Sequence, residues 1–403
     1  MQDIFIGRQA IFDRNYNVSS YKLLFRQGSD SSLRNDDHKT AKVLVDALID
    51  LGLDKLSGDK KVHINASPTF VLSDLSELFP PEQVGIEILD PSSINADMIK
   101  ACKALKEKGY ELTLNNITYA PHLEPLIELA DVVKVDISNV KDLTAEVRAL
   151  RKFNVQLLAS KVETYADYEK TQSLGFNYFQ GFFFCKPEIV EGKTMPESKI
   201  NILRALQQVL TANVVADIND LIKQDVSLSY RLLKYINSAA FGMQREIESI
   251  EQALVLLGLN NARRWLSLLS LASLGEGKPL ELMRTSLYRG HLLESIAKGL
   301  HEEETGDDFL LGMFSVLDAL LDQPMQEAIE GMALPSPVRD ALLRDDAAMS
   351  YKLNVVRALE SGAWDDVARW GEQYRALKVT DLMALHTEAL AWSDAQINAI
   401  QGG

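Results

Sequence analysis

The sequence predicts two domains of different class, an N-terminal (β/α) barrel over residues 1–190 and an all-helical domain over residues 191–403. Three observations support this division. Short apolar runs with the composition of strands alternate with amphipathic segments in the first half. Polar residues follow these runs, as they do at the strand ends of a parallel barrel. After Lys186-Pro187 the strand pattern stops, and helical spacing continues to the end of the chain.

Composition is that of a soluble globular protein and argues against two classes of partner. Of 403 residues, 46% are hydrophobic and 25% are charged, which allows a core in each domain. The net charge of −15 argues against nonspecific nucleic-acid binding, which needs a basic surface. No apolar run approaches the ~18 residues of a membrane span, and the N-terminus lacks a signal-peptide pattern. The only cysteines, Cys102 and Cys185, form no metal spacing and are typical of a reducing compartment, so we expect a cytoplasmic protein.

Two β-prone runs open the barrel. Ile4 to Gly7 and Val18 to Phe25 are separated by the turn residues Asp13-Arg14-Asn15, which predicts a hairpin or two adjacent strands. Thr40 to Leu51 follows with apolar residues at helical spacing, which predicts a helix.

The alternation continues to the end of the first half. Strands are predicted at residues 62–65, 85–89, 111–114, 132–136, 155–159 and 178–183. Helices are predicted after Ser67-Pro68 and at residues 96–108, 121–129, 143–152 and 165–174. Continuous apolar strands between helices predict a parallel sheet covered by helices. Roughly seven or eight units in ~190 residues fit a closed barrel better than an open sheet, which periodicity alone leaves as the alternative.

Polar residues end the predicted barrel strands, where the functional site of such a barrel lies. These residues are Asn65, Glu87, Asn115, Asn116, Lys134, Asp136, Ser160, Lys161, Glu163 and Gln180. Any one of them alone could instead cap a helix or satisfy loop backbone. The whole set, spread over the successive strand ends, favours a pocket.

Seven short motifs occur in order along the first half of the chain. They are Tyr21–Arg26, Ile64–Ser67, Ile86–Ile88, Leu114–Asn116, Lys134–Asp136, Ala159–Thr164 and Gln180–Pro187. Together they resemble the motifs of the EAL domain, a TIM-like barrel family that hydrolyses cyclic di-GMP with two divalent metal ions. The family pattern is kept at Asn65, Glu87, Lys134, Asp136, Glu163 and Gln180.

Four residues depart from the EAL pattern at positions that the resemblance makes metal-binding or acid/base. They are Lys22, Asn115, Asn116 and Ser160, which stand for a glutamate, two aspartates and a glutamate. These changes make the pocket five charge units more positive than the family pattern, two from the lysine, two from the asparagines and one from the serine. Two adjacent divalent cations need anionic oxygens and repel an ammonium group. We therefore predict that the two-metal site is lost, that no cofactor is bound and that the barrel is a pseudo-enzyme.

Lys22 has two alternative roles in such a pocket. A lysine inside a barrel mouth is costly unless it is paired. Glu87 lies near it if the barrel forms, so one expectation is a Lys22–Glu87 contact. The alternative is an anion site in which Lys22, Arg26 and Lys134 hold a phosphate group without metal. We favour the pair, because the retained Glu87 needs a partner as well.

The second half contains only helical patterns. Helices are predicted at residues 199–211, 217–223, 227–236, 250–257, 261–274, 286–300, 309–321, 324–331, 336–343, 349–362, 364–377 and 380–400. Gly258 is a stop signal between two of them. The segment 309–321 is nearly all apolar, which predicts a central buried helix.

Three stretches of this half, Asp225–Ala239, Ser249–Gly258 and Phe309–Asp318, resemble the HDOD domain. The resemblance covers most of residues 198–343 and implies a protein-interaction module, related to metal-dependent HD phosphohydrolases but without their His–Asp ligands. The sequence agrees with the absence of these ligands, because no histidine in the chain is followed by aspartate. We expect the isolated histidines to be surface or packing residues: His291, His301 and His386.

Three functions follow as alternatives. The first is a non-catalytic bacterial signalling protein that binds protein partners through its HDOD domain. The second is a cyclic di-GMP receptor that binds without hydrolysis, and the third is an active phosphodiesterase, which the change in pocket charge disfavours. The sequence leaves the partner, the input signal and homo-oligomerisation open.

Overall fold

The structure, a computed structural model, describes residues 4–27, 53–72, 79–89, 95–187, 197–212, 214–223, 232–233, 236, 247, 249–303, 305–330, 332–374 and 376–401. The helix predicted at residues 40–51 and most of that at 227–236 lie outside them. The chain divides into two compact units, Met1–Lys186 with Asn354–Ala391, and Pro187–Leu353 with Trp392–Gly403. Compact units are defined by contacts and family domains by sequence, so the domains predicted at 1–190 and 191–403 stay a prediction. Residues 354–391 lie in the same compact unit as the barrel.

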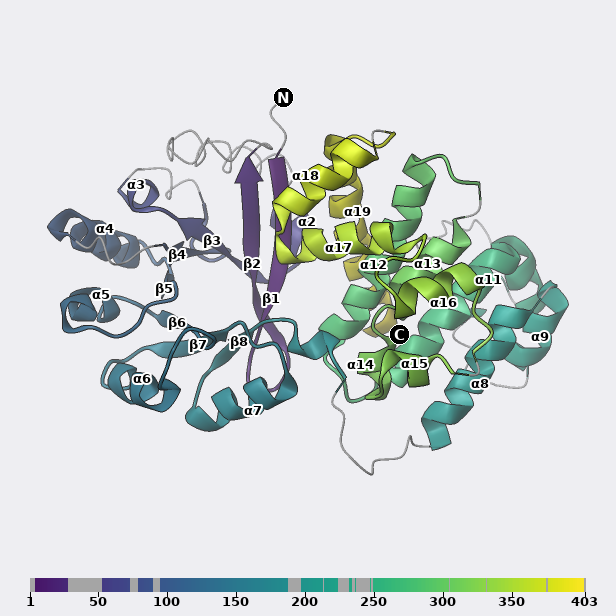
Figure 1. The fold of residues 1–403 in the computed structure, drawn as a ribbon, viewed down its shortest axis with the longest axis horizontal. Coiled ribbons are helices and arrows are strands. Elements are labelled where there is room, and N and C mark those ends of the chain that lie inside the picture. The colour runs from purple at the N-terminus through teal and green to yellow at the C-terminus, as the bar shows by residue number, and fades with distance from the viewer. Residues whose placement is uncertain are drawn as a thin grey trace. The chain divides into compact units, whose positions relative to one another are not determined.

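The first unit contains a closed barrel of eight strands, which decides against the open sheet (Figure 1). The strands are β1 Ile4–Phe12, β2 Val18–Gln27, β3 Lys61–Ala66, β4 Val84–Ile88, β5 Leu112–Leu114, β6 Val132–Asp136, β7 Gln156–Ser160 and β8 Tyr178–Gln180. Strand β1 is antiparallel to both of its neighbours, and the remaining neighbours are parallel. The parallel strands place their C-terminal residues at one end, where such barrels carry their sites.

The first two strands form the predicted hairpin, and it is longer than the rest of the barrel wall. Its pairing begins at Ile4 opposite Gln27 and includes Gln9 opposite Lys22. Strand β2 pairs with β3 only from Ser20 to Lys22. Lys22 therefore lies where the hairpin leaves the parallel sheet.

Short helices cover the outside of the barrel (Figure 1). They are α2 Leu53–Ser57, α3 Pro68–Val71, α4 Ala96–Glu107, η4 Pro121–Leu123, α5 Glu124–Ile127, α6 Leu143–Leu150, α7 Tyr165–Leu174 and η5 Phe183–Cys185. The Ser67 side chain accepts a hydrogen bond from the Phe70 backbone, so the predicted cap of α3 is confirmed. Thr164 and Asp167 form a capping box at the start of α7.

The last strand is shorter than its apolar run predicts. The run continues to Phe183, but β8 ends at Gln180 and the chain turns at Gly181. A Cβ atom at Gly181 would lie 1.9 Å from the Val162 carbonyl oxygen, so the backbone itself packs there. This contact is tertiary, and hydrophobic periodicity carries no signal for it.

The second unit is helical, as predicted. It contains α8 Glu197–Thr211, α9 Val215–Lys223, α11 Ile250–Leu274, α12 Leu280–Gly299, α13 Gly306–Phe314, α14 Leu317–Leu321, α15 Met325–Ala328 and α16 Ser336–Leu343. The remaining helices are α17 Ser350–Ser361, α18 Trp364–Gln373 and α19 Val379–Gln401. No helix among the described residues is long and apolar enough to cross a membrane.

Two helix predictions in this unit have instructive outcomes. Gly258 has φ 72° and ψ 166° inside α11, so the helix breaks at the predicted stop. The single helix predicted at residues 309–321 is wrong, because it divides into α13 and α14 at Ser315. The Ser315 hydroxyl donates to the Gly312 carbonyl at 2.7 Å and accepts from Arg289 at 3.1 Å, and these polar contacts replace the helical continuation. Both pieces are buried, as expected for a central segment.

Candidate functional site

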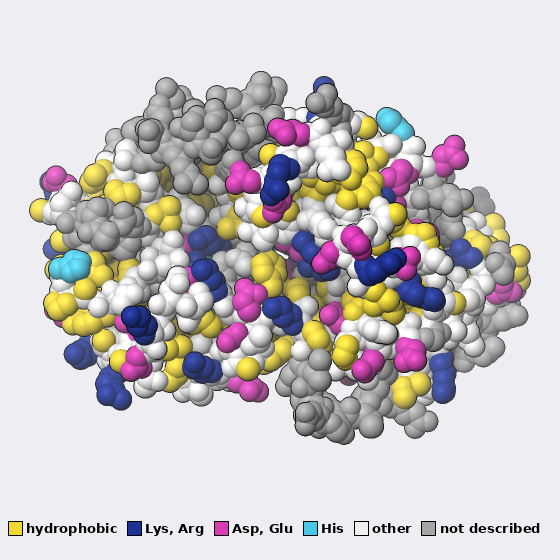
Figure 2. Space-filling view, in the orientation of Figure 1, with side chains coloured by type: hydrophobic (Ala, Val, Ile, Leu, Met, Phe, Trp, Pro, Cys, Tyr) yellow, Lys and Arg dark blue, Asp and Glu magenta, His cyan; other side chains and the backbone are white. Residues whose placement is uncertain are grey.

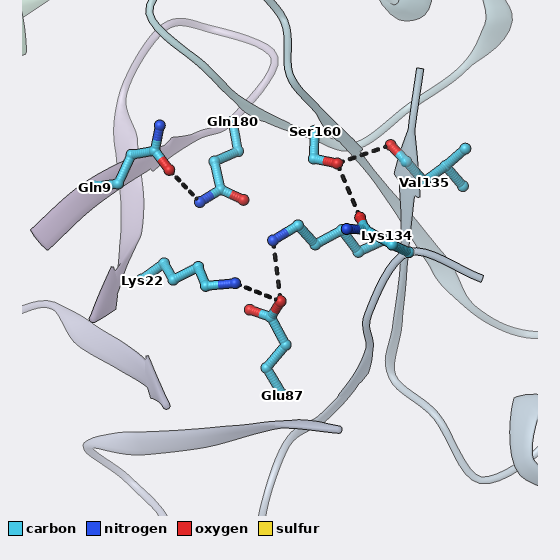
Figure 3. A network of polar contacts seen from close by, with 8 residues as sticks. Gln9, Lys22, Glu87, Lys134, Val135, Ser160 and Gln180 are labelled. Atoms are coloured by element: carbon cyan, nitrogen blue, oxygen red, sulfur yellow. Dashed lines mark hydrogen bonds and ion pairs between the residues drawn. The ribbon is translucent and has the colours of Figure 1, made fainter. Parts of the chain in front are cut away.

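The mouth of the barrel contains a buried cluster of two lysines on one carboxylate. Lys22 Nζ donates to Glu87 Oε1 at 2.7 Å, and Lys134 Nζ donates to the same oxygen at 3.0 Å. The three residues are 7%, 1% and 4% exposed. They come from β2, β4 and β6 and point toward one another across the barrel (Figure 3). The predicted Lys22–Glu87 contact is confirmed, and Lys134 joins it.

The cluster is electrostatically uneven. Burial opposes ionisation of Glu87, but Lys134 and Lys22 together outweigh it and hold the pKa of this carboxyl below its usual range. Burial also disfavours the charged form of Lys134, and the neighbouring Lys22 adds to this effect. The pKa of Lys134 therefore falls from 10.5 to about 8, despite the attraction of Glu87. One carboxylate thus serves two ammonium groups, and one unit of positive charge is left in the mouth.

The two other retained carboxylates are also paired with lysines. Asp136 Oδ2 lies 2.8 Å from Lys161 Nζ, and Asp136 accepts further hydrogen bonds from Ser138 and Asn139. Burial raises the pKa of Asp136, but the contacts with Lys161 and Ser138 outweigh this effect and lower the pKa below its usual value. Glu163 is half exposed and lies 3.6 Å from Lys186. Every acidic residue kept from the EAL pattern therefore has an ammonium group as neighbour.

Lys161 holds an unusual backbone conformation. Its φ is 58°, in the left-handed region that favours glycine. In the EAL motif that Ala159–Thr164 resembles, this position is a glycine. A side chain with a Cβ costs about 1–2 kcal/mol in this conformation, and here its ammonium group is brought onto Asp136. Asn116 has φ 49° and is a residue type that tolerates the same region.

The neutral residues of the rim pair among themselves. Ser160 Oγ lies 3.1 Å from Asn116 Oδ1 and 3.2 Å from the Val135 carbonyl oxygen, and its one hydrogen can be donated to either. Gln180 Nε2 donates to Gln9 Oε1 at 2.7 Å (Figure 3). Asn115 Oδ1 and Gln180 Oε1 are buried and have no hydrogen-bond partner among the described residues. The last site residue on a strand, Asn65, is exposed.

Some of these contacts were not predicted from the sequence, and the structure does not describe the side chain of one predicted site residue. Gln9 was not expected in the site, although alternation along the first strand would have put it on the inner face with Ile11. The partnerships of Lys161 and Lys186 were not expected either. Arg26 belongs to β2, but its side chain lies outside the described part of the structure. The anion site that includes Arg26 therefore stays a prediction.

These residues do not fit a pair of divalent metal ions. Such ions take anionic oxygens as ligands, and bridging them requires carboxylates. The mouth offers Glu87 held by two ammonium groups, Asp136 held by one, and neutral side chains at 115, 116 and 160. A metal ion at Glu87 would lie beside the ammonium groups of Lys22 and Lys134, which both contact its Oε1.

The histidines of the helical half behave differently from one another. The His291 ring stacks on Trp392 with 4.4 Å between ring centroids. His386 is fully buried, and His301 is exposed. Packing or exposure thus describes each of them, as predicted.

Comparison with known proteins agrees with both halves of this description. The EAL domain model matches residues 51–187, and the HDOD domain model matches residues 194–330. The Bacillus subtilis protein YuxH is 31% identical over 405 residues, which span 96% of this chain and 98% of the relative. The chain belongs to the EAL–HDOD family. It is thus a signalling protein with an EAL barrel and an HDOD domain, related to cyclic di-GMP phosphodiesterases.

Two further matches carry names that mention cyclic di-GMP. A Vibrio cholerae protein named cyclic di-GMP phosphodiesterase CdgJ is 29% identical over 376 residues, 91% of this chain and 87% of that protein. The structure of Klebsiella pneumoniae BlrP1 in its calcium and cyclic di-GMP complex is 22% identical, with a TM-score of 0.38. That match covers 45% of this chain and 55% of the BlrP1 chain, about half of each.

The depressed pKa of Lys134 predicts a pH dependence of stability. Between pH 8 and 10.5 the unfolded chain retains a proton on Lys134 that the folded chain has lost. Stability rises with pH wherever the unfolded state binds more protons. The EAL–HDOD chain should therefore gain stability across this window relative to its Lys134→Met variant. Urea unfolding of both proteins at pH 7.5, 9 and 10.5 would measure this, and a constant difference in the free energy of unfolding would contradict it.

Proposed function

We propose that this EAL–HDOD chain is a non-catalytic signalling protein, in which a pseudo-enzyme barrel is joined to an HDOD domain that binds protein partners. The observation that carries the proposal is the shared oxygen of Glu87. Lys22 occupies the position of a glutamate in the family motif and donates to this oxygen at 2.7 Å. An acidic position has become an internal cation, and the carboxylate that remains serves to neutralise it.

The other departures support the same proposal. Asn115 and Asn116 carry no charge, and Ser160 hydrogen-bonds locally where the family has a glutamate. A phosphodiester bond is attacked in the EAL family with the help of metal-bound water, and acidifying that water requires the metal ions. A barrel without the ligands for those ions keeps its shape and loses this chemistry. Its remaining use is as a surface whose state other proteins can read.

A second candidate is a cyclic di-GMP receptor that binds without hydrolysis. Two features of the mouth favour it. Two ammonium groups share one carboxylate, so a phosphate group would meet net positive charge. The buried oxygens of Asn115 and Gln180 have no partner within the described residues and can accept hydrogen bonds from a ligand.

Calorimetry combined with product analysis separates these functions. The full chain is titrated with cyclic di-GMP in buffer alone, with Mg²⁺ and with Mn²⁺, and each mixture is assayed for the linear product. We expect no turnover under any of the three conditions. Metal-independent binding without turnover would identify the receptor. Turnover that depends on Mg²⁺ or Mn²⁺ would overturn the proposal and give this chain the activity named for CdgJ.

A further inference from the structure

The segment 354–391 lies beyond both family matches, since the EAL model ends at residue 187 and the HDOD model at residue 330. It nevertheless belongs to the compact unit of the barrel. It consists of most of α17, all of α18 and the first half of α19. Three of its contacts with the barrel are made on the β1–β2 hairpin.

A glycine of the hairpin packs closely against this segment. A Cβ atom at Gly7 would lie 2.8 Å from the Leu359 carbonyl oxygen and 3.2 Å from the Trp364 ring. The backbone of β1 thus packs directly on the end of α17 and on the first residue of α18. The segment has a second close approach to the neighbouring strand β2. A Cβ atom at Gly362 would lie 3.0 Å from a methyl group of Leu24 in that strand. Two glycines, one on each side of the interface, therefore allow the helices to approach the hairpin.

A buried histidine makes the third contact. His386 of α19 is 1% exposed and hydrogen-bonds to the backbone of Ile6. Burial lowers the pKa of this imidazole to about 3, and the positive charge of Arg8 acts in the same direction. The side chain is therefore neutral at physiological pH, as a packed residue in an apolar interface must be.

These contacts lie on a part of the barrel wall where β2 pairs with β1 but not with β3. A two-stranded ribbon is marginally stable by itself, and beyond Lys22 strand β2 has no pairing to β3. The three contact points, at Ile6, Gly7 and Leu24, lie within this extension. Gln9, which holds Gln180, and Lys22, which holds Glu87, face each other in the register at its base.

We propose that the segment 354–391 braces the β1–β2 hairpin and completes the EAL unit, so that the placement of Lys22 depends on the C-terminal end of the chain. The partner of this hairpin surface is thus a segment of the same chain that neither family model includes. The proposal does not depend on whether the barrel hydrolyses cyclic di-GMP.

Hydrogen exchange on the full-length chain tests the brace. In Trp364→Ala we expect amide exchange in β1 and β2 to accelerate about tenfold or more, because local opening sets the exchange rate. The matched control is Trp265→Ala, which removes another buried indole from α11 in the other unit and should leave exchange in β1 and β2 unchanged. Unchanged exchange of β1 and β2 in Trp364→Ala would overturn the proposal. Equal acceleration in β4 to β7 would also overturn it, since the segment would then support the whole core.

Gly7→Ala is the second variant, and it tests the same contact if Trp364→Ala does not fold. It adds one carbon against the Leu359 carbonyl oxygen instead of removing a ring. The brace predicts the same selective acceleration in β1 and β2, because either change separates the helices from the hairpin. Exchange at the wild-type rate in Gly7→Ala would contradict it.

Discussion

Replacing Glu87 with glutamine should lower the free energy of unfolding of the barrel unit by about 3–5 kcal/mol, the cost of breaking a buried ion pair on one side. The amide keeps the shape of the carboxyl group but cannot neutralise Lys22 or Lys134, which are 7% and 4% exposed. Lys22 and Lys134 would then remain buried in the mouth without a carboxylate, so each would have to stay charged without a partner or lose its proton. Calorimetry of the full chain would measure the loss in the free energy of unfolding. Hydrogen exchange of the β4 amides would identify which transition belongs to the barrel unit.

Two further variants sharpen this test. Glu163→Gln makes the same chemical change in a half-exposed residue 3.6 Å from Lys186, so it should cost only about 0–1 kcal/mol. Lys22→Met in the Glu87→Gln background removes one of the two stranded cations and should recover part of the loss. Equal small losses in Glu87→Gln and Glu163→Gln would show that the cluster is solvated and contributes little.

The Lys22–Glu87 contact was predictable from the barrel topology. Parallel strands of a barrel bring their C-terminal ends together, and a buried lysine and a buried glutamate near one another must pair. The pair of Lys161 with Asp136 was not predictable in the same way. It depends on the left-handed conformation of Lys161 after β7, where φ is 58°. Lysine has no preference for that conformation, so the sequence does not predict it.

The C-terminal helices show a second limit. The helical patterns at residues 349–362 and 364–377 correspond to α17 and α18, although α18 already ends at Gln373, and the closing helices predicted at 380–400 form the single helix α19. Periodicity reports which face of a helix is apolar, and it does not report which unit that face packs against. Only the glycines gave a local signal, because Gly7 inside a strand marks a close backbone approach. The partner of that approach lies more than 350 residues away in the chain.

Restoring the family's acidic residues should restore metal binding and turnover. The variant combines Lys22→Glu, Asn115→Asp, Asn116→Asp, Ser160→Glu and Lys161→Gly. It removes the ammonium groups from positions 22 and 161, returns four carboxylates to the rim and relieves the left-handed lysine. Carboxylate oxygens are the ligands that Mg²⁺ and Mn²⁺ need. We expect calorimetric Mn²⁺ binding and cyclic di-GMP hydrolysis at least about 100-fold above the wild-type background, since metal catalysis is worth several kcal/mol.

The control for this gain is the same variant with Glu87→Gln. Glu87 is a buried carboxylate that the wild-type chain keeps in the mouth, where it contacts both lysines. Under the proposed function, Glu87 becomes available as a metal ligand, the role that the EAL resemblance implies for it, once Lys22 is gone. Its amide should then abolish both Mn²⁺ binding and hydrolysis. A restored variant that folds and binds no Mn²⁺ would contradict this account. The proposed lack of activity would then have its cause in another part of the barrel, and the four departures would not explain it.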